Sequence, residues 1–119
     1  GVWCEAKRLG RPWGVGKGFD FSAPVSSVRP VEKTGEVNRG RIWLKVNGQL
    51  RQDSDVSKMI WKVSETIEHL SKYFELVPGD LVFTGTPEGV AAVVPGDVLE
   101  GGVDGVGTLH LKIAPPAQD

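Results

Sequence analysis

The sequence contains very little cysteine, no marked excess of either charge and no long apolar run. Cys4 is the single cysteine among 119 residues, which excludes an internal disulfide and any metal site built from several cysteines. We interpret it as a small apolar helix residue rather than a reactive thiol, consistent with a reducing cytoplasm. The 14 basic and 15 acidic residues nearly cancel, so neither nucleic acid nor an anionic membrane is a predicted partner. The longest apolar stretches are too short to span a bilayer.

What is present is typical of one globular domain with a modest core. Hydrophobic residues make up 39% of the chain and charged residues 24%, so wholesale disorder is not expected. The chain does not begin with Met, and Val2 to Leu9 reads as a helix already under way, with no capping residue before it. We therefore expect the sequence to be a fragment of a longer protein.

The first 40 residues are predicted to be mostly irregular. The helix should stop at Gly10, which is followed closely by Pro12. Gly14, Gly16 and Gly18 then alternate around Lys17, which predicts a loop whose backbone approaches another group closely. We expect a short extended segment at residues 24–31 and a surface loop at residues 32–40.

A β-hairpin is the clearest local prediction. Residues 41–46 alternate, with Ile42, Leu44 and Val46 on one face and Arg41, Trp43 and Lys45 on the other. Asn47-Gly48 follows, and residues 49–52 form the returning strand. The pattern predicts a type I′ turn with positive φ at both turn residues. The first face should be more buried than Arg41 and Lys45.

The remaining sequence predicts one helix followed by short strands. Ser64 is the expected N-cap of a helix that runs to about Phe74. Val77-Pro78-Gly79-Asp80 and Val94-Pro95-Gly96-Asp97 repeat one turn signature, and each should lead into an apolar strand. Two or three further strands are expected in residues 98–113. The predicted fold class is therefore α+β, dominated by β-structure, with one or two helices.

Common catalytic motifs do not fit this chain. Gly16-Lys17 fails as a phosphate-binding loop, because Arg11 stands where a Gly is needed and Gly18 where a Ser or Thr is needed. His69 and His110 lie on different predicted elements, and no Ser-His-Asp or Cys-His arrangement is visible. From the residues alone, Lys17 is a solvated side chain and Thr86 a turn residue.

A series of short patches nevertheless follows a distinctive order. The patches are Gly10-Arg11-Pro12-Trp13, Gly16-Lys17-Gly18-Phe19-Asp20, Ala23-Pro24-Val25, Val46-Asn47-Gly48, Arg51-Gln52, Ser57-Lys58-Met59-Ile60-Trp61, Pro78-Gly79-Asp80, Phe83-Thr84-Gly85-Thr86-Pro87-Glu88-Gly89-Val90 and Pro95-Gly96-Asp97. This series resembles the C-terminal half of the fumarylacetoacetate hydrolase family, and within it the bacterial fumarylpyruvate hydrolases and acylpyruvases. The likeness implies that residues 1–119 are the C-terminal portion of a single catalytic domain, part of that family's mixed β-roll.

The resemblance also implies site residues. In that family two Glu and one Asp hold Mg²⁺ or Mn²⁺, and the likeness places them upstream of Gly1, so no metal ligand is assigned in this chain. Lys17 matches the active-site lysine, implying a catalytic and substrate-binding ammonium that stabilises an enolate or carboxylate oxygen. Thr86 matches the threonine that hydrogen-bonds the keto-acid end of the substrate. We expect Lys17 and Thr86 to line one cavity. Trp3 stands where related enzymes place a substrate-contacting Gln, so either the substrate differs or the first residues are out of native register.

The implied activity is hydrolysis of a C–C bond in an acylpyruvate, a 1,3-diketo acid, to pyruvate and a carboxylic acid. The resemblance further implies a role in aromatic catabolism, a cytoplasmic location, a homodimer and a small keto acid as the partner, with the fragment alone inactive. Two alternatives stay open: decarboxylation or isomerisation of a 2-oxo-dioic acid, and a non-catalytic β module for dimerisation or ligand binding. The sequence does not identify the acyl group.

Overall fold

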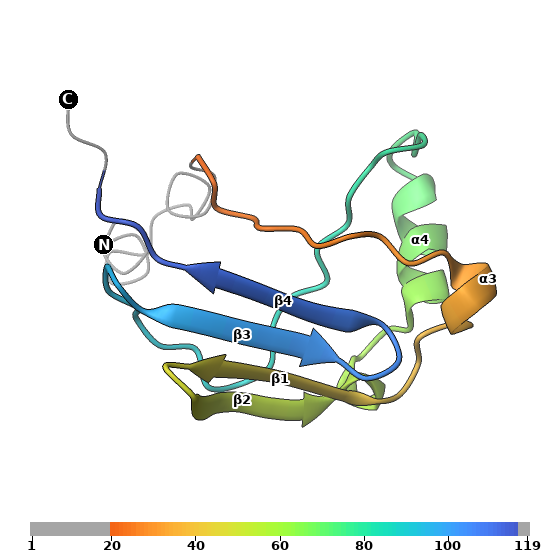
Figure 1. Ribbon diagram of the computed structural model, residues 1–119. Coiled ribbons are helices and arrows are strands. Elements are labelled where there is room, and N and C mark those ends of the chain that lie inside the picture. Colours follow the sequence, from red (N-terminus) through yellow and green to blue (C-terminus); the bar gives the residue numbers. More distant parts are fainter. Residues whose placement is uncertain (1–19, 117–119) are drawn as a thin grey trace, which may run out of the picture.

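The computed structural model describes residues 20–116 of the chain (Figure 1). In chain order its elements are α3 (Val31–Thr34), β1 (Arg41–Val46), β2 (Gln49–Asp55), the 3₁₀ turn η1 (Val56–Lys58), α4 (Val63–Ser71), β3 (Val98–Val103) and β4 (Gly107–Lys112). Four strands and two α-helices within these residues confirm the predicted β-dominated α+β class. The expected helix at residues 2–9 and the loop around Lys17 lie outside the described residues.

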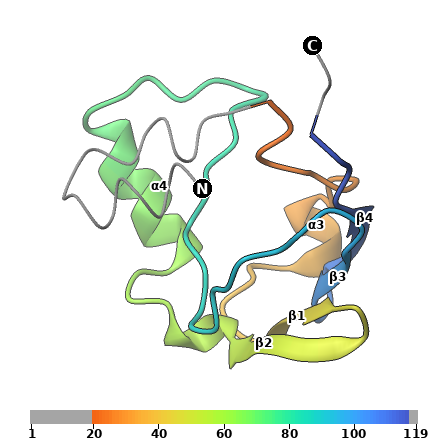
Figure 2. The same cartoon turned by 90° about the vertical axis from the view of Figure 1, so that its left-hand side faces the viewer.

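The strands form one antiparallel sheet in the order β2-β1-β3-β4. Figure 2 shows α4 well apart from this sheet, with the segment that follows α4 running between them. Within residues 20–116, no helix is long and apolar enough to cross a membrane.

The two faces of the sheet differ in chemistry. Residues paired across strands share a face, so one face is mostly apolar and carries Ile42, Leu44, Val46, Leu99, Val103, Leu109, Leu111 and, as polar exceptions, Gln49, Gln52 and Ser54. The other face carries mostly polar side chains, among them Arg41, which forms an ion pair with Asp53 at 2.7 Å. Val46 is the only buried hydrophobic residue within the described chain, so the apolar face is only partly covered.

The hairpin prediction is confirmed. Asn47 has φ 52° and Gly48 has φ 78°, the positive values that a type I′ turn requires. The Asn47 amide also donates to Asp97 Oδ1 at 2.9 Å, and its Oδ1 accepts from the backbone N–H of Val98 at 2.9 Å. The turn is thereby tied to the start of β3.

The predicted burial pattern of the first hairpin strand holds only in part. Val46 is buried, Ile42 and Leu44 are half-buried and Arg41 is exposed, as expected. Lys45 is half-buried too, so it is not set apart from Ile42 and Leu44. The reason is the Trp43 ring, whose centroid lies 5.4 Å from the Lys45 ammonium, because a long lysine stem can cover apolar surface while its charge stays wet.

Helix α4 begins earlier than predicted. The prediction of Ser64 as the N-cap is wrong, because Lys62 precedes the first helical residue, Val63. The backbone N–H of Lys62 donates to Glu65 Oε2 at 3.1 Å, so a glutamate inside the first turn satisfies this end of the helix. The helix ends at Ser71, and a turn from Leu70 continues to Phe74.

The two repeated turns adopt the same geometry. Gly79 and Gly96 both have φ 95°, and in each turn the aspartate carboxylate accepts from the backbone N–H of the valine three residues earlier, at 2.9 and 3.0 Å. The second turn leads into β3, as predicted. The prediction of a strand after the first turn is wrong, because residues 81–83 belong to no sheet and are exposed. Identical turn chemistry therefore produces a strand only where a partner strand lies beside it.

Candidate active site

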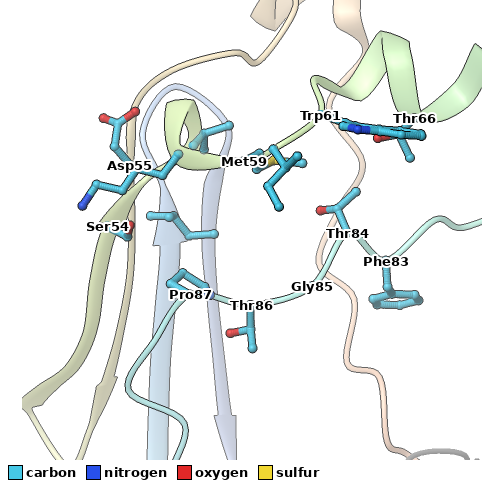
Figure 3. Close-up of a pocket in the computed structure, with 14 residues that line it drawn as sticks. Ser54, Asp55, Met59, Trp61, Thr66, Phe83, Thr84, Gly85, Thr86 and Pro87 are labelled. Atoms are coloured by element: carbon cyan, nitrogen blue, oxygen red, sulfur yellow. The ribbon is translucent and has the colours of Figure 1, made fainter.

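The segment Thr84–Pro87 separates two cavities. The larger, about 630 Å³, lies among this segment, the end of β2, η1 and the start of α4, with Asp55, Lys58 and Trp61 in its wall (Figure 3). The smaller, about 300 Å³, lies between the same segment and the sheet face, with Gln52 and Leu44 in its wall. Thr86 borders both cavities.

The two threonines of this segment point in opposite directions. In Figure 3, the side chain of Thr84 points toward Trp61 and Met59, whereas that of Thr86 points to the opposite side of the backbone. Thr84 borders only the larger cavity. Residues i and i+2 of an extended segment face the same side, so the opposite directions of Thr84 and Thr86 require a turn at Gly85. Gly85 has φ 93°, and a β-carbon added there would meet nothing within 4 Å.

A buried amide holds the segment in place. Gln52, 9% exposed, lies on the apolar face of the sheet. Its Nε2 donates to Thr86 Oγ1 at 2.9 Å and to the carbonyl oxygens of Pro87 at 2.7 Å and Glu88 at 3.3 Å. A buried amide without partners is costly, so these bonds secure both the amide and the segment.

An irregularity in β2 makes this contact possible. Leu44 pairs with Gln52 but Lys45 pairs with Leu50, which leaves Arg51 as an extra residue, a β-bulge. Gly89, with φ 99°, packs against the carbonyl oxygen of Arg51 so closely that a β-carbon would clash with it. The bulge and the missing side chain of Gly89 together let the Thr86 segment approach the sheet.

The charged groups of the larger cavity are Asp55 and Lys58. Hydrogen bonds from the side chain and backbone N–H of Ser57, followed by the N–H of Gly40, lower the pKa of Asp55 below its ordinary value. The backbone bonds measure 2.9 Å from Ser57 and 3.3 Å from Gly40. Both bonds end on Asp55 Oδ1, so this oxygen is engaged in stabilising the start of η1. It is not placed as a general base.

Within residues 20–116, no group of three His, Cys, Asp or Glu side chains gathers so as to hold a metal ion. This part of the chain therefore does not by itself fit a metal centre. Lys17 and Trp3 lie outside the described residues, so the shared cavity of Lys17 and Thr86 stays a prediction.

Sequence reasoning singled out Thr86 and gave no role to Gln52 or Lys58. The structure places Gln52 in hydrogen-bond contact with Thr86 and Lys58 in the wall of the larger cavity that Thr86 borders. Arg51-Gln52 and Ser57-Lys58 both belong to the ordered patches, yet neither pattern assigns a role to its second residue. Only the fold brings Gln52 to Thr86, 34 positions later in the chain.

Comparison with known proteins gives this arrangement its context. Residues 2–114 match the family profile described as fumarylacetoacetate (FAA) hydrolase C-terminal. The chain belongs to the fumarylacetoacetate hydrolase family. This confirms the resemblance carried by the ordered patches, and the segment with Thr86 lies inside the matched region.

Individual members of the family are similar over nearly the whole chain. It is 46% identical over 110 residues to a fumarylpyruvate hydrolase of Ralstonia sp, covering 92% of this chain and 57% of the relative. It is 45% identical over 112 residues to the mitochondrial oxaloacetate tautomerase of Rattus norvegicus, covering 94% and 51%. The crystal structure of fumarylpyruvate hydrolase from Pseudomonas aeruginosa in complex with Mn²⁺ and pyruvate superimposes with a TM-score of 0.88 at 46% identity, covering 95% of this chain and 48% of that one. The chain thus spans about half the length of these relatives.

Proposed function

We propose that this chain is the C-terminal portion of the catalytic domain of a C–C bond hydrolase that converts an acylpyruvate into pyruvate and a carboxylic acid. The structural observation that carries the proposal is the Thr86 hydroxyl, held by a buried amide in the wall of two cavities. Support comes from a relative named fumarylpyruvate hydrolase and from the complex of another such enzyme with Mn²⁺ and pyruvate.

In the proposed reaction, water adds across the bond between the acyl carbon and the methylene carbon. The hydroxyl group joins the acyl carbon, which becomes the carboxylic acid. The electron pair of the broken bond stays on the pyruvate fragment as an enolate, which then takes up a proton on its methylene carbon. Negative charge thus develops on the pyruvate oxygens, where hydrogen-bond donors and cations are most effective.

The residues of this chain would act at the pyruvate end. Thr86 would donate its hydroxyl to a keto-acid oxygen, and Lys17 would place an ammonium beside the enolate or carboxylate oxygen. The divalent metal, Mg²⁺ or Mn²⁺, would be held by carboxylates upstream of Gly1. Residues 1–119 alone would then be inactive.

A second candidate is decarboxylation or tautomerisation of oxaloacetate, a 2-oxo-dioic acid. Relatives carry both names: the tautomerase of Rattus norvegicus and a mitochondrial oxaloacetate decarboxylase of Dictyostelium discoideum, 39% identical over 103 residues. Both reactions pass through the same enolate, so the Thr86 segment suits either. The two candidates differ in their substrates: the hydrolase needs an acyl group on the pyruvate unit, and oxaloacetate has none.

Product analysis decides between these functions. The complete protein is incubated with Mn²⁺ and either fumarylpyruvate or oxaloacetate, and the products are identified by chromatography and by release of carbon dioxide. Fumarate together with pyruvate supports the hydrolase. Turnover of oxaloacetate alone supports the second candidate, and turnover of neither would favour a non-catalytic module.

The Thr86 assignment has a matched control in the same segment. Thr86→Val keeps the shape but removes the hydroxyl, and losing one hydrogen bond to the substrate should raise KM by about three- to tenfold. Thr84→Val makes the same chemical change on the opposite side of the backbone and should leave KM closer to the wild-type value. Equal effects of the two variants would contradict the assignment.

The homodimer, the cytoplasmic location and the role in aromatic catabolism also remain proposals that come from the resemblance. Sedimentation of the complete protein tests the first of these.

A further inference from the structure

The atoms around the Gln52 amide determine which way it faces. The carbonyl oxygens of Pro87 and Glu88 can only accept hydrogen bonds, so the amide group that lies 2.7 and 3.3 Å from them must be the NH₂ end. The same NH₂ group lies 2.9 Å from Thr86 Oγ1. The Thr86 oxygen is therefore the acceptor in this bond.

The direction of this bond determines which hydrogen bonds the Thr86 hydroxyl can form with another molecule. A hydroxyl has one hydrogen to donate and two lone pairs that accept. Gln52 occupies a lone pair, and no acceptor within residues 20–116 takes the hydrogen. Since Thr86 borders both cavities, its hydrogen is available to a molecule that enters there.

The placement of Gln52 requires an explanation of its own. The residue paired with Gln52 across the sheet is the apolar Leu44, and Leu44 pairs with Gly101 from the other side. A glutamine in this position costs desolvation energy that an apolar residue would avoid. Its three bonds all end on the segment 86–88. Its role is therefore directed at that segment rather than at the sheet.

We propose that Gln52 is a positioning residue, which occupies the acceptor side of the Thr86 hydroxyl and so presents Thr86 to the ligand as a hydrogen-bond donor. The site then favours ligands that offer an acceptor oxygen at this point, such as a carboxylate or ketone, over ligands that offer a hydroxyl or amide N–H. The inference rests on the proposed function in taking that ligand to be a 2-oxo acid. It goes beyond it by naming the residue that sets the polarity of the contact.

A double-mutant cycle tests whether Gln52 acts through Thr86. Gln52→Met has similar length and volume but cannot hydrogen-bond. It is combined with wild-type Thr86, with Thr86→Ser, which keeps the hydroxyl, and with Thr86→Val, which removes it. Binding of pyruvate to the complete protein with Mn²⁺ is measured by calorimetry, and KM and kcat for the turned-over substrate are recorded beside it.

The expected pattern is specific to positioning. Gln52→Met should weaken pyruvate binding by about three- to tenfold in the wild-type and Thr86→Ser backgrounds, with a matching rise in KM and little change in kcat. In the Thr86→Val background it should have no further effect. A purely structural role would give the same factor in all three backgrounds, and that result would overturn the inference while leaving the proposed function intact.

Two further outcomes bear on the inference. If the wild-type protein does not bind pyruvate, the proposed function fails, and the inference about Gln52 is overturned with it. If Gln52→Met does not fold, Gln52→Leu replaces it, because leucine fills a similar space but has no hydrogen to donate to Thr86. That variant should weaken pyruvate binding at least as much, and unchanged binding would refute the inference.

Discussion

The close approach of Gly89 to the bulge of β2 gives a prediction that can be worked out from the structure. Gly89→Ala adds one methyl group at a residue whose φ is 99°. That methyl would clash with the carbonyl oxygen of Arg51 and lie 3.2 Å from Gln52 Cγ. Both neighbours belong to the strand that holds the Thr86 segment. The substitution should therefore separate this segment from the sheet.

Two effects contribute to the cost, and a second glycine isolates one of them. Placing a side chain at such a φ costs about 1–2 kcal/mol, and overpacking against backbone adds about 1–3 kcal/mol. Gly79 has φ 95°, but nothing lies within 4 Å of an added β-carbon there. Gly79→Ala should therefore destabilise the protein by about 1–2 kcal/mol, and Gly89→Ala by about 2–5 kcal/mol.

Urea denaturation of the complete protein measures both free energies of unfolding, and pyruvate titration shows the functional consequence. Gly89→Ala should weaken pyruvate binding, because Thr86 loses its support, whereas Gly79→Ala should not. Equal destabilisation by the two substitutions, or undisturbed pyruvate binding in Gly89→Ala, would show that the contact with Arg51 does not hold the segment in place.

Other predictions concern charge and metal. A hydrogen bond from the backbone N–H of Val94, followed by one from the Asn47 side chain, lowers the pKa of Asp97. Its stabilising effect is therefore complete above the ordinary carboxyl pKa of about 4 and is lost as pH falls through the lower folded-state value. Asp97→Asn should accordingly flatten the loss of urea stability below about pH 4, and an unchanged slope would contradict this. Lys17→Ala should lower kcat by about 10²–10³ while leaving the circular dichroism spectrum unchanged, and near-normal kcat would make Lys17 a surface residue. Residues 1–119 alone should bind Mn²⁺ weakly and turn over no acylpyruvate, and calorimetry showing tight 1:1 binding would contradict this.

Local sequence signals were reliable where one short segment contains its own partners. Asn47-Gly48 specifies a type I′ turn through the backbone preferences of two adjacent residues. The repeated Pro-Gly-Asp turns likewise close through atoms within four residues. The start of α4 was predicted wrongly, because Ser64 has the side chain of a typical cap, whereas Glu65 satisfies the backbone N–H of Lys62 from inside the first turn.

The register of the hairpin shows why the rest could not be predicted. A regular two-residue turn that pairs Val46 with Gln49 would place Arg51 opposite Leu44 and Gln52 opposite Trp43, on the polar face. The bulge shifts β2 by one residue, so Gln52 faces Leu44 on the apolar side instead. No residue type or spacing within the hairpin predicts this shift.

The sequence by itself determined the family, the β-dominated class and the hairpin turn, because each depends on residue identity over a short span or on the order of motifs. Only the tertiary structure decided that residues 81–83 remain unpaired. It also decided that Gly89 packs against the carbonyl oxygen of Arg51 and that the Gln52 amide donates a hydrogen bond to Thr86. These contacts join residues more than thirty positions apart. Such contacts depend on the register of a bulged sheet, and register is a property of the assembled strands rather than of any one of them.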